Sequence, residues 1–217
     1  MNAQTERLTL SGAQGAIEAV RDGAHLADLA AASRGVAVIA HPHPLFGGTM
    51  DNKVVQTLAR AFVQCGWTTV RFNFRGVGGT EGSYDEGRGE LEDLLAVVEQ
   101  VAPKGEGLPL ALAGFSFGAF VTSHALAALW PEGRVQQAVL VGTAVSRFNV
   151  APVPAEAHAR TLVLHGEMDD TVPLSAVMDW ARPQILPVTV IPAGGHFFHG
   201  QLPLLKSLVV RHLQSGV

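Results

Sequence analysis

Short apolar runs recur along the chain, and most are followed by a segment rich in glycine or proline and then by a longer amphipathic stretch. An apolar run that is too short for a helix and is bounded by such residues predicts a buried strand, whereas apolar positions that recur with the helical period predict a helix. The buried strands predicted in this way are Gly35–Ala40, Trp67–Phe74, the run from Leu108 to Gly114, Gln137–Gly142, Arg160–His165 and Pro187–Pro192.

The amphipathic stretches between these runs predict helices, and only the N-terminal part of the chain differs. There, Arg7–Ser11 and Gly15–Val20 alternate between polar and apolar residues around glycines, which predicts an antiparallel hairpin. Strands that alternate with helices at this spacing indicate an α/β protein with a mostly parallel central sheet and helices on both faces. Because no linker divides the chain, we expect residues 1–217 to form a single domain. The predicted helices cover about Asp51–Gln64 with Thr49 or Asp51 as the N-cap, Gly89–Val101, the stretch directly after Ser116, Pro173–Trp180 and Gln201–Gln214.

Composition and charge narrow the classes of function. Hydrophobic residues make up 47% of the 217 residues and charged residues 16%, which is typical of a compact globular domain. A net charge of −4 provides no basic stripe, so no nucleic acid is expected as a partner. Cys65 is the only cysteine, which rules out an intrachain disulfide and favours a reducing compartment. Since neither a signal peptide nor a bilayer-spanning apolar stretch is visible, we expect a soluble cytoplasmic protein with no membrane partner.

The segment Gly114-Phe115-Ser116-Phe117-Gly118 joins a predicted buried strand directly to a predicted helix. This is the context that a G-x-S-x-G nucleophile motif requires, because the backbone turns so tightly there that a Cβ at either flank would clash. The helix that begins at the serine directs its first N–H groups toward any anion that forms beside Oγ. The alternative is a turn of small residues that only packs a helix onto the sheet.

A serine nucleophile needs an imidazole to accept its proton and a carboxylate to orient that imidazole. The loop after Arg160–His165 contains Glu167, Asp169 and Asp170. We select Asp169 as the orienting carboxylate and keep Asp170 as the alternative. A second use for Asp170 is as a cap of the helix near Pro173.

The loop after the last predicted strand, Ala193-Gly-Gly-His196-Phe-Phe-His199, supplies two candidate bases. His196 follows two glycines on a loop at the carboxyl end of a strand, where it can reach the serine, so we favour it. His199 is expected at the surface near the start of the last helix. His165 is expected to be an ordinary residue at a strand end.

Two backbone N–H groups should stabilise the oxyanion, one of them from Phe117, the residue after the nucleophile. The other should come from the loop that begins His41-Pro42-His43-Pro44-Leu45, where the prolines have no N–H, so His43 or Leu45 remains and His43 is better placed. A metal site on His41 and His43 is a weak alternative, because no supporting ligand spacing follows. The glycine-rich loop from Gly76 also fails as a nucleotide motif, because Glu81 stands where G-x-G-x-x-G requires its third glycine.

Four segments together resemble the α/β-hydrolase superfamily, and more narrowly its small, lidless bacterial serine hydrolases. They are Gly114-Phe-Ser-Phe-Gly118, Asn73-Phe-Arg-Gly76, His165-Gly-x-x-Asp169-x-x-Val-Pro173 and His196-Phe-Phe-His199. The resemblance extends from about Gly35 onward and implies a central sheet of the eight-stranded type. It also implies Ser116, Asp169 and His196 as a catalytic triad and Phe117 with His43 as the oxyanion donors.

Only the loop Ser146–Arg160 occupies the place where relatives insert a lid, so we expect no cap domain and an open site. The candidate residues of an apolar substrate pocket on the site loops are Leu45, Phe46, Val172, Phe197 and Phe198. These features predict a hydrolase that cleaves a carboxylic ester or thioester of a small soluble molecule through an acyl-enzyme, with no metal or cofactor. The alternatives are a peptide or amide hydrolase and a non-catalytic scaffold that binds a ligand. No oligomeric state is predicted.

Overall fold

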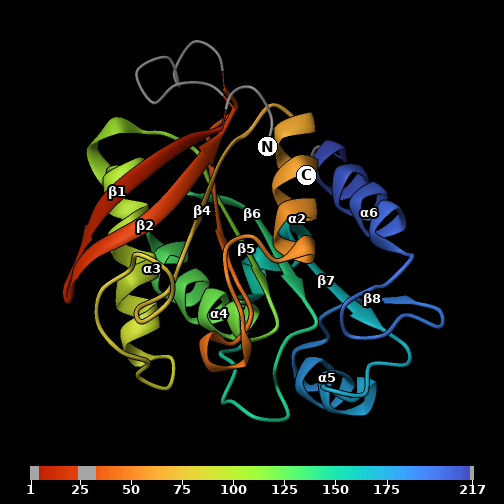
Figure 1. Cartoon of the computed structure of the whole chain (residues 1–217). Helices are drawn as coiled ribbons and strands as arrows, with labels where there is room; N and C mark the ends of the chain where they lie inside the picture. The colour runs from red at the N-terminus through yellow and green to blue at the C-terminus, as the bar shows by residue number, and fades with distance from the viewer. Residues whose placement is uncertain (1–4, 24–32, 216–217) are drawn as a thin grey trace.

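The computed structural model describes residues 5–23 and 33–215, and its centre is one eight-stranded sheet (Figure 1). The order of the strands across the sheet is β1-β2-β4-β3-β5-β6-β7-β8. The strands are β1 (Glu6–Gly12), β2 (Gly15–Asp22), β3 (Val36–Ala40), β4 (Thr68–Phe72), β5 (Leu110–Phe115), β6 (Val135–Val141), β7 (Thr161–Gly166) and β8 (Val188–Ile191).

Strand direction divides the sheet into a small antiparallel edge and a parallel body. β1 and β2 form the expected hairpin, and β2 also pairs antiparallel with β4. From β4 through β3 to β8, every neighbouring pair is parallel. The predicted α/β fold with a mostly parallel sheet is therefore confirmed. Because parallel strands end at the same edge, the loops that follow β3, β5, β6, β7 and β8 gather there.

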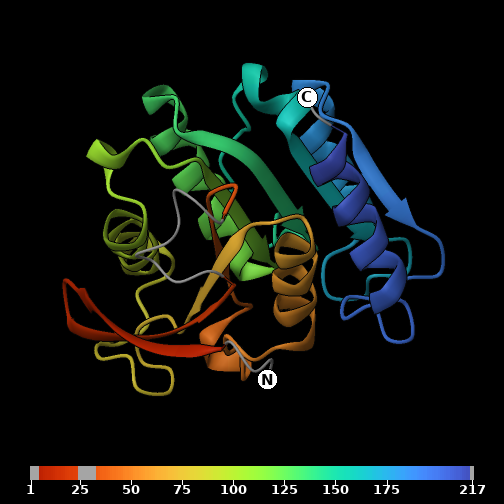
Figure 2. The ribbon, with the colours of Figure 1, turned by 90° about the horizontal axis from the view of Figure 1, so that it is seen from above.

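Helices cover both faces of the sheet, as Figure 2 shows from above. The helices are α2 (Lys53–Gln64), α3 (Arg88–Val101), α4 (Phe117–Leu129), α5 (Leu174–Ala181) and α6 (Leu202–Gln214). The prediction that Thr49 or Asp51 caps α2 is wrong. Asn52 is the N-cap, and its Oδ1 accepts the Val54 N–H at 2.9 Å. No helix among the described residues is long and apolar enough to cross a membrane.

Two separate cores explain why the central parallel strands β3 and β5 have no polar side chain. In β3, Val36, Val38 and Ala40 belong to the core on the side of α3, α4 and α5, whereas Ala37 and Ile39 belong to the core under α2 and α6. Successive side chains of a strand point to opposite faces, so a strand covered on both faces has no polar positions.

His41 connects the ends of two neighbouring strands, directly beyond β3. Its ring is fully buried, Nε2 accepts the Phe74 N–H at 3.0 Å, and Nδ1 therefore carries the proton that it donates to the Pro42 carbonyl at 2.6 Å. Both ring nitrogens are thus engaged, which leaves none for the metal site that the sequence offered as an alternative. Burial lowers the pKa of His41 to about 4, although its hydrogen bond to Pro42 acts in the opposite direction.

We expect His41 to make the protein less stable as the pH falls. A histidine in the unfolded chain binds a proton with a pKa of about 6.5, so between that value and about 4 the unfolded state binds the proton and the folded state does not. This difference lowers the free energy of unfolding by about 2 kcal/mol from pH 7 to pH 5 and adds nothing further well below pH 4. Urea denaturation should show a pH dependence that is smaller by about this amount in His41→Gln. Equal pH dependence in both proteins would contradict the assignment.

Candidate active site

Ser116 stands at the turn between β5 and α4 with an unusual backbone conformation, φ 57° and ψ −115°. A positive φ is costly for a residue with a side chain, so the surrounding backbone must hold it in place. The Ser116 N–H donates to the Val141 carbonyl of β6 at 2.8 Å, and the Ser116 carbonyl accepts from the Ala119 N–H at 3.0 Å. The turn is therefore fixed to both the sheet and the following helix.

The two flanking glycines are required by close approach of the backbone. A Cβ on Gly114 would lie 2.4 Å from the Gly118 carbonyl oxygen, and a Cβ on Gly118 would lie 2.5 Å from the Ala40 carbonyl oxygen. Both distances are far inside van der Waals contact, and the atoms that they meet are backbone. The pattern of glycines around Ser116 therefore follows from the packing of β5, α4 and the end of β3.

Gly114→Ala should destabilise the protein by about 1–3 kcal/mol, because the new methyl group overpacks a rigid turn. It should also lower hydrolytic activity by displacing the backbone that holds Ser116. Gly105→Ala is the matched control, since a Cβ there meets nothing within 4 Å. Thermal denaturation of both variants checks the expectation. Similar melting temperatures would show that the turn tolerates a side chain.

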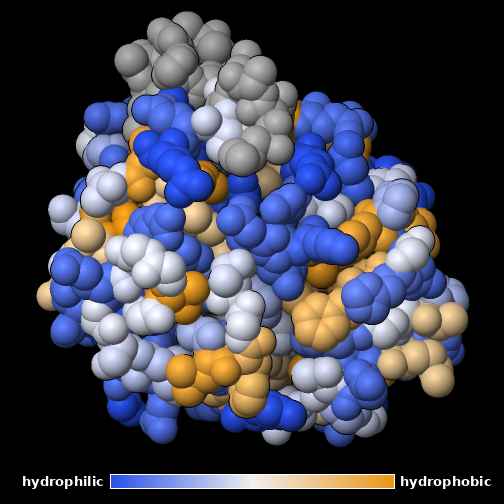
Figure 3. Space-filling view, in the orientation of Figure 1, coloured by the Kyte–Doolittle hydropathy of each residue, from blue (hydrophilic) through white to orange (hydrophobic). Residues whose placement is uncertain are grey.

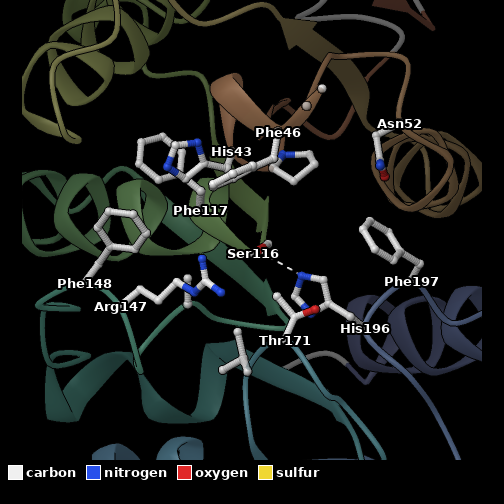
Figure 4. A pocket seen from close by; sticks show the side chains of 15 residues that line it. His43, Phe46, Asn52, Ser116, Phe117, Arg147, Phe148, Thr171, His196 and Phe197 are labelled. Atoms are coloured by element: carbon white, nitrogen blue, oxygen red, sulfur yellow. Dashed lines mark hydrogen bonds between the residues drawn. The ribbon is translucent and has the colours of Figure 1, made fainter.

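Three loops bring Ser116, His196 and Asp169 into one hydrogen-bonded chain, of which Figure 4 shows the bond between Ser116 and His196. Ser116 Oγ lies 3.0 Å from His196 Nε2, and His196 Nδ1 lies 2.7 Å from Asp169 Oδ2. All three residues are buried, with exposed fractions of 8%, 4% and 6% in that order. Because Nδ1 faces a carboxylate and donates to it, the lone pair of Nε2 is available to accept the serine proton.

The carboxylate of Asp169 is held at both oxygens. Oδ1 accepts the N–H groups of Thr171 and Val172 at 3.0 and 2.8 Å, while Oδ2 faces His196. Burial on its own raises the pKa of Asp169, but the hydrogen bonds from His196 and Val172 outweigh it and lower the pKa overall. Asp169 is therefore an anion at neutral pH.

The imidazole of His196 is positioned by its neighbours as well as by its hydrogen bonds. The ring of Phe115 lies 5.0 Å from it and the ring of Phe197 lies 5.1 Å away, edge-on. A Cβ on Gly142 would approach the imidazole Cε1 to 3.3 Å, so the glycine leaves the space that the ring occupies. These contacts limit the rotation of the imidazole around the line from Asp169 to Ser116.

The competing candidates lie outside this chain of hydrogen bonds. Asp170 is exposed, and among the described residues its side chain accepts a hydrogen bond only from the hydroxyl of Thr171. It does not cap α5, whose N-cap is Pro173. Glu167 accepts the Ala193 N–H at 2.9 Å and so joins the β7 and β8 loops. His199 is exposed. Of the residues weighed from the sequence, the structure brings Asp169 and His196 to the serine.

His165 is a site residue that the sequence did not identify. It is fully buried, its Nε2 lies 2.9 Å from the Val172 carbonyl and 3.5 Å from Asp169 Oδ2, and its Nδ1 has no hydrogen-bond partner among the described residues. Burial lowers its pKa, so the ring is neutral and Nε2 carries the proton. His165 thus places its Nε2–H group beside Asp169 Oδ2, the same oxygen that faces His196. One feature of the sequence could have identified it: His165 stands at the end of the strand that precedes the Asp169 loop, four residues before Asp169.

The two predicted oxyanion donors lie on the same pocket. Phe117 is the first residue of α4, where the N–H has no partner inside the helix. On the opposite loop, the short 3-10 helix Pro44–Phe46 follows His43, and the Leu45 N–H donates to His43 Nδ1 at 3.2 Å. That bond engages Leu45, so His43 remains the better candidate of the two. The ring of His43 packs 4.9 Å from that of Phe117.

A pocket of about 350 Å³ opens beside Ser116 and His196. In Figure 3 apolar side chains are scattered over this face of the molecule, and some of them lie in its lower half, where the loops after the parallel strands lie in Figure 1. The lining residues are Pro42, His43, Phe46, Gly47, Gly48, Asn52, Ser116, Phe117, Ala144, Arg147, Phe148, Thr171, Val172, His196 and Phe197.

Three of the five predicted pocket residues, Phe46, Val172 and Phe197, line this pocket, and the prediction is wrong for the other two. Phe198 is fully buried in the core under α2 and α6, because a turn with φ 51° directs it away from its neighbour Phe197. Leu45 is 66% exposed and is not among the residues that line the pocket. The lining residues that the sequence did not suggest include Asn52, Arg147, Phe148 and Thr171.

Comparison with known proteins agrees with this geometry. Residues 31–158 match the family model of the serine aminopeptidases, S33. A crystal structure of an α/β serine hydrolase without a lid from Xanthomonas campestris is 36% identical, with a TM-score of 0.85 over 99% of this chain and 95% of that one. An α/β serine hydrolase homologue from Coxiella burnetii is also 36% identical, with a TM-score of 0.80 over 98% of this chain and 99% of that one.

An uncharacterized protein of Rickettsia prowazekii is 42% identical over 87 residues, which are 40% of this chain and 37% of that protein. The chain thus spans little more than a third of the length of this relative. The expected absence of a cap domain is confirmed by the lidless neighbour, since both chains align over nearly their whole length. The chain belongs to the serine aminopeptidase S33 family of the α/β-hydrolase superfamily, and it has the fold of the lidless serine hydrolases.

Proposed function

We propose that the protein is a serine esterase that cleaves carboxylic esters or thioesters of small soluble substrates through an acyl-enzyme. The observation that carries this proposal is the hydrogen-bonded chain from Ser116 Oγ through His196 to Asp169, with distances of 3.0 and 2.7 Å. A serine hydroxyl is a weak nucleophile unless a base accepts its proton as it attacks, and this arrangement supplies that base.

In this mechanism Ser116 Oγ attacks the carbonyl carbon while His196 Nε2 takes the hydroxyl proton. Asp169 stabilises the imidazolium that forms and keeps its Nδ1 proton in place. The N–H groups of Phe117 and His43 donate to the negative oxygen of the tetrahedral intermediate. His196 then protonates the leaving alcohol or thiol, and water repeats the sequence on the acyl-enzyme with His196 as the base.

The pocket supports a small substrate. Its volume of about 350 Å³ accommodates a short acyl or aryl group, and Phe46, Phe148, Val172 and Phe197 provide apolar walls.

We propose that the protein acts in the cytoplasm. A reducing compartment is in keeping with the single cysteine of the sequence, Cys65, which is buried.

A peptidase is the second candidate, because the family model takes its name from aminopeptidases. An aminopeptidase must bind the α-ammonium group of its substrate, and carboxylates are the usual partners of buried or half-buried cations. The lining residues include no Asp or Glu, whereas Arg147 contributes a positive charge. This charge pattern favours the ester over a peptide with a free N-terminus.

Pre-steady-state kinetics with 4-nitrophenyl acetate test the proposal. We expect a burst of nitrophenolate of about one equivalent per chain, because acylation of a serine precedes its hydrolysis. A matched pair, 4-nitrophenyl butyrate and the 4-nitroanilide of butyrate, then separates ester from amide hydrolysis. Faster turnover of the anilide would favour the peptidase, and no turnover of either substrate by folded protein would favour a non-catalytic scaffold.

A further inference from the structure

Arg147 is a charged residue in the pocket that the proposed mechanism does not use. It lies in the loop after β6, and Figure 4 shows its side chain extending past Phe148 with the guanidinium directed into the pocket toward Ser116. Within residues 5–23 and 33–215, Arg147 has no ion pair with a carboxylate. Arg75, by comparison, is held by Asp93 at 2.7 Å. The guanidinium of Arg147 is therefore available to a ligand.

The rest of the pocket does not neutralise this charge. No Asp, Glu or Lys lines it, and Asp169 faces the far side of His196. Burial and the neighbouring Arg147 charge both lower the pKa of His43, which keeps that imidazole neutral at physiological pH. Glu86 lines the adjoining hollow together with Arg147, but its carboxylate lies 3.8 Å from Arg88. The pocket thus contains one permanent cation among apolar walls.

We propose that the pocket selects anionic substrates, in which an ester or thioester carries a carboxylate a few bonds from the scissile carbonyl. This inference rests on the proposed esterase function and names its substrate class. The planar guanidinium can bind a carboxylate through two parallel N–H···O bonds, and it is more weakly hydrated than an ammonium group. The apolar part of the same substrate packs against Phe46 and Phe197 on the other walls of the pocket.

Two matched pairs of esters test the proposal and locate the carboxylate. In the acyl pair, the 4-nitrophenyl monoester of glutaric acid is compared with 4-nitrophenyl pentanoate. In the leaving-group pair, the butyrate ester of 4-hydroxybenzoate is compared with that of 4-hydroxybenzamide. The ratio of kcat/KM for the anionic to the neutral member is measured in the wild type, Arg147→Gln, Arg147→Lys and Arg211→Gln. Arg211 is an exposed arginine of α6 outside the pocket, so its variant controls for net charge.

We expect the ratio to fall by about tenfold or more in Arg147→Gln for at least one pair, to recover in part in Arg147→Lys and to stay near the wild-type value in Arg211→Gln. Added salt should reduce the ratio in the wild type, because Arg147 is exposed and salt screens its charge. The pair that responds identifies whether the carboxylate belongs to the acyl group or to the leaving group. Equal ratios in the wild type and Arg147→Gln for both pairs would overturn the proposal and leave the esterase function intact.

A binding measurement makes the result independent of turnover. The Kd of 4-nitrophenyl glutarate and of 4-butyryloxybenzoate is measured by calorimetry with Ser116→Ala and with the double variant Ser116→Ala/Arg147→Gln. Binding of one of them should weaken by about tenfold or more in the double variant. Equal Kd values for both ligands would overturn the proposal, even if no ester were hydrolysed and the esterase function had itself failed.

Discussion

Ser116→Ala should lower kcat/KM for 4-nitrophenyl butyrate by about 10⁶-fold, down to the level that binding and oxyanion stabilisation alone provide. The variant removes the hydroxyl that attacks the substrate, and His196 then has no serine proton to accept. The fold should persist, because the hydroxyl hydrogen-bonds only to His196 among the described residues, while the backbone bonds of the turn do not involve it.

Steady-state assays on purified protein check this expectation, with circular dichroism to establish that the variant is folded. Ser146→Ala is the matched control, since this exposed serine precedes Arg147 in the same group of loops but does not line the pocket. Its kcat/KM should stay within about twofold of the wild type. Comparable losses in the two variants, or a small loss in Ser116→Ala, would show that another residue is the nucleophile.

Asp169→Asn should lower kcat by about 10⁴-fold with little change in structure. The amide can still accept the N–H groups of Thr171 and Val172 through its oxygen, so its NH₂ group faces His196 Nδ1. Nδ1 must then accept, which moves the imidazole proton to Nε2 and leaves no lone pair for Ser116. The variant therefore tests the orientation of the imidazole rather than its presence.

Asp170→Asn is the control for this prediction, because it makes the same chemical change at the neighbouring, exposed position. Its kcat should remain close to that of the wild type. The turnover number kcat is measured with saturating substrate at several pH values around neutrality. Differences in substrate affinity between the variants then do not affect the comparison. A large loss in Asp170→Asn with a small loss in Asp169→Asn would reverse the assignment of the carboxylate.

The sheet and its covering helices could be predicted from the sequence because local patterns determine them. The uninterrupted apolar run of Gly35–Ala40 indicates a strand that is buried on both faces. In the structure, the residues of this strand alternate between the two cores. The turn at Ser116 was visible for a similar reason, since the close backbone contacts at Gly114 and Gly118 admit only glycine. Because both loops follow strands that were predicted to be parallel, Asp169 and His196 could also be placed at one edge of the sheet.

Side-chain directions within the loops could not be predicted, because they depend on backbone conformations without a distinct sequence pattern. Phe197 and Phe198 are identical neighbours, yet one lines the pocket and the other belongs to the core, since Phe198 adopts a positive φ. Arg147 lies in a loop whose path no apolar period describes, and its direction into the pocket depends on that path. The role of His165 depends on a contact with Asp169 that only the folded β7 loop creates.

Labelling with a fluorophosphonate, followed by mapping of the adduct by mass spectrometry, shows whether Ser116 is the nucleophile that His196 and Asp169 activate. We expect one adduct per chain on the peptide that contains Ser116, no adduct in Ser116→Ala and much slower labelling in Asp169→Asn than in Asp170→Asn. Adduct formation at another residue, or folded wild-type protein that stays unlabelled, would contradict it.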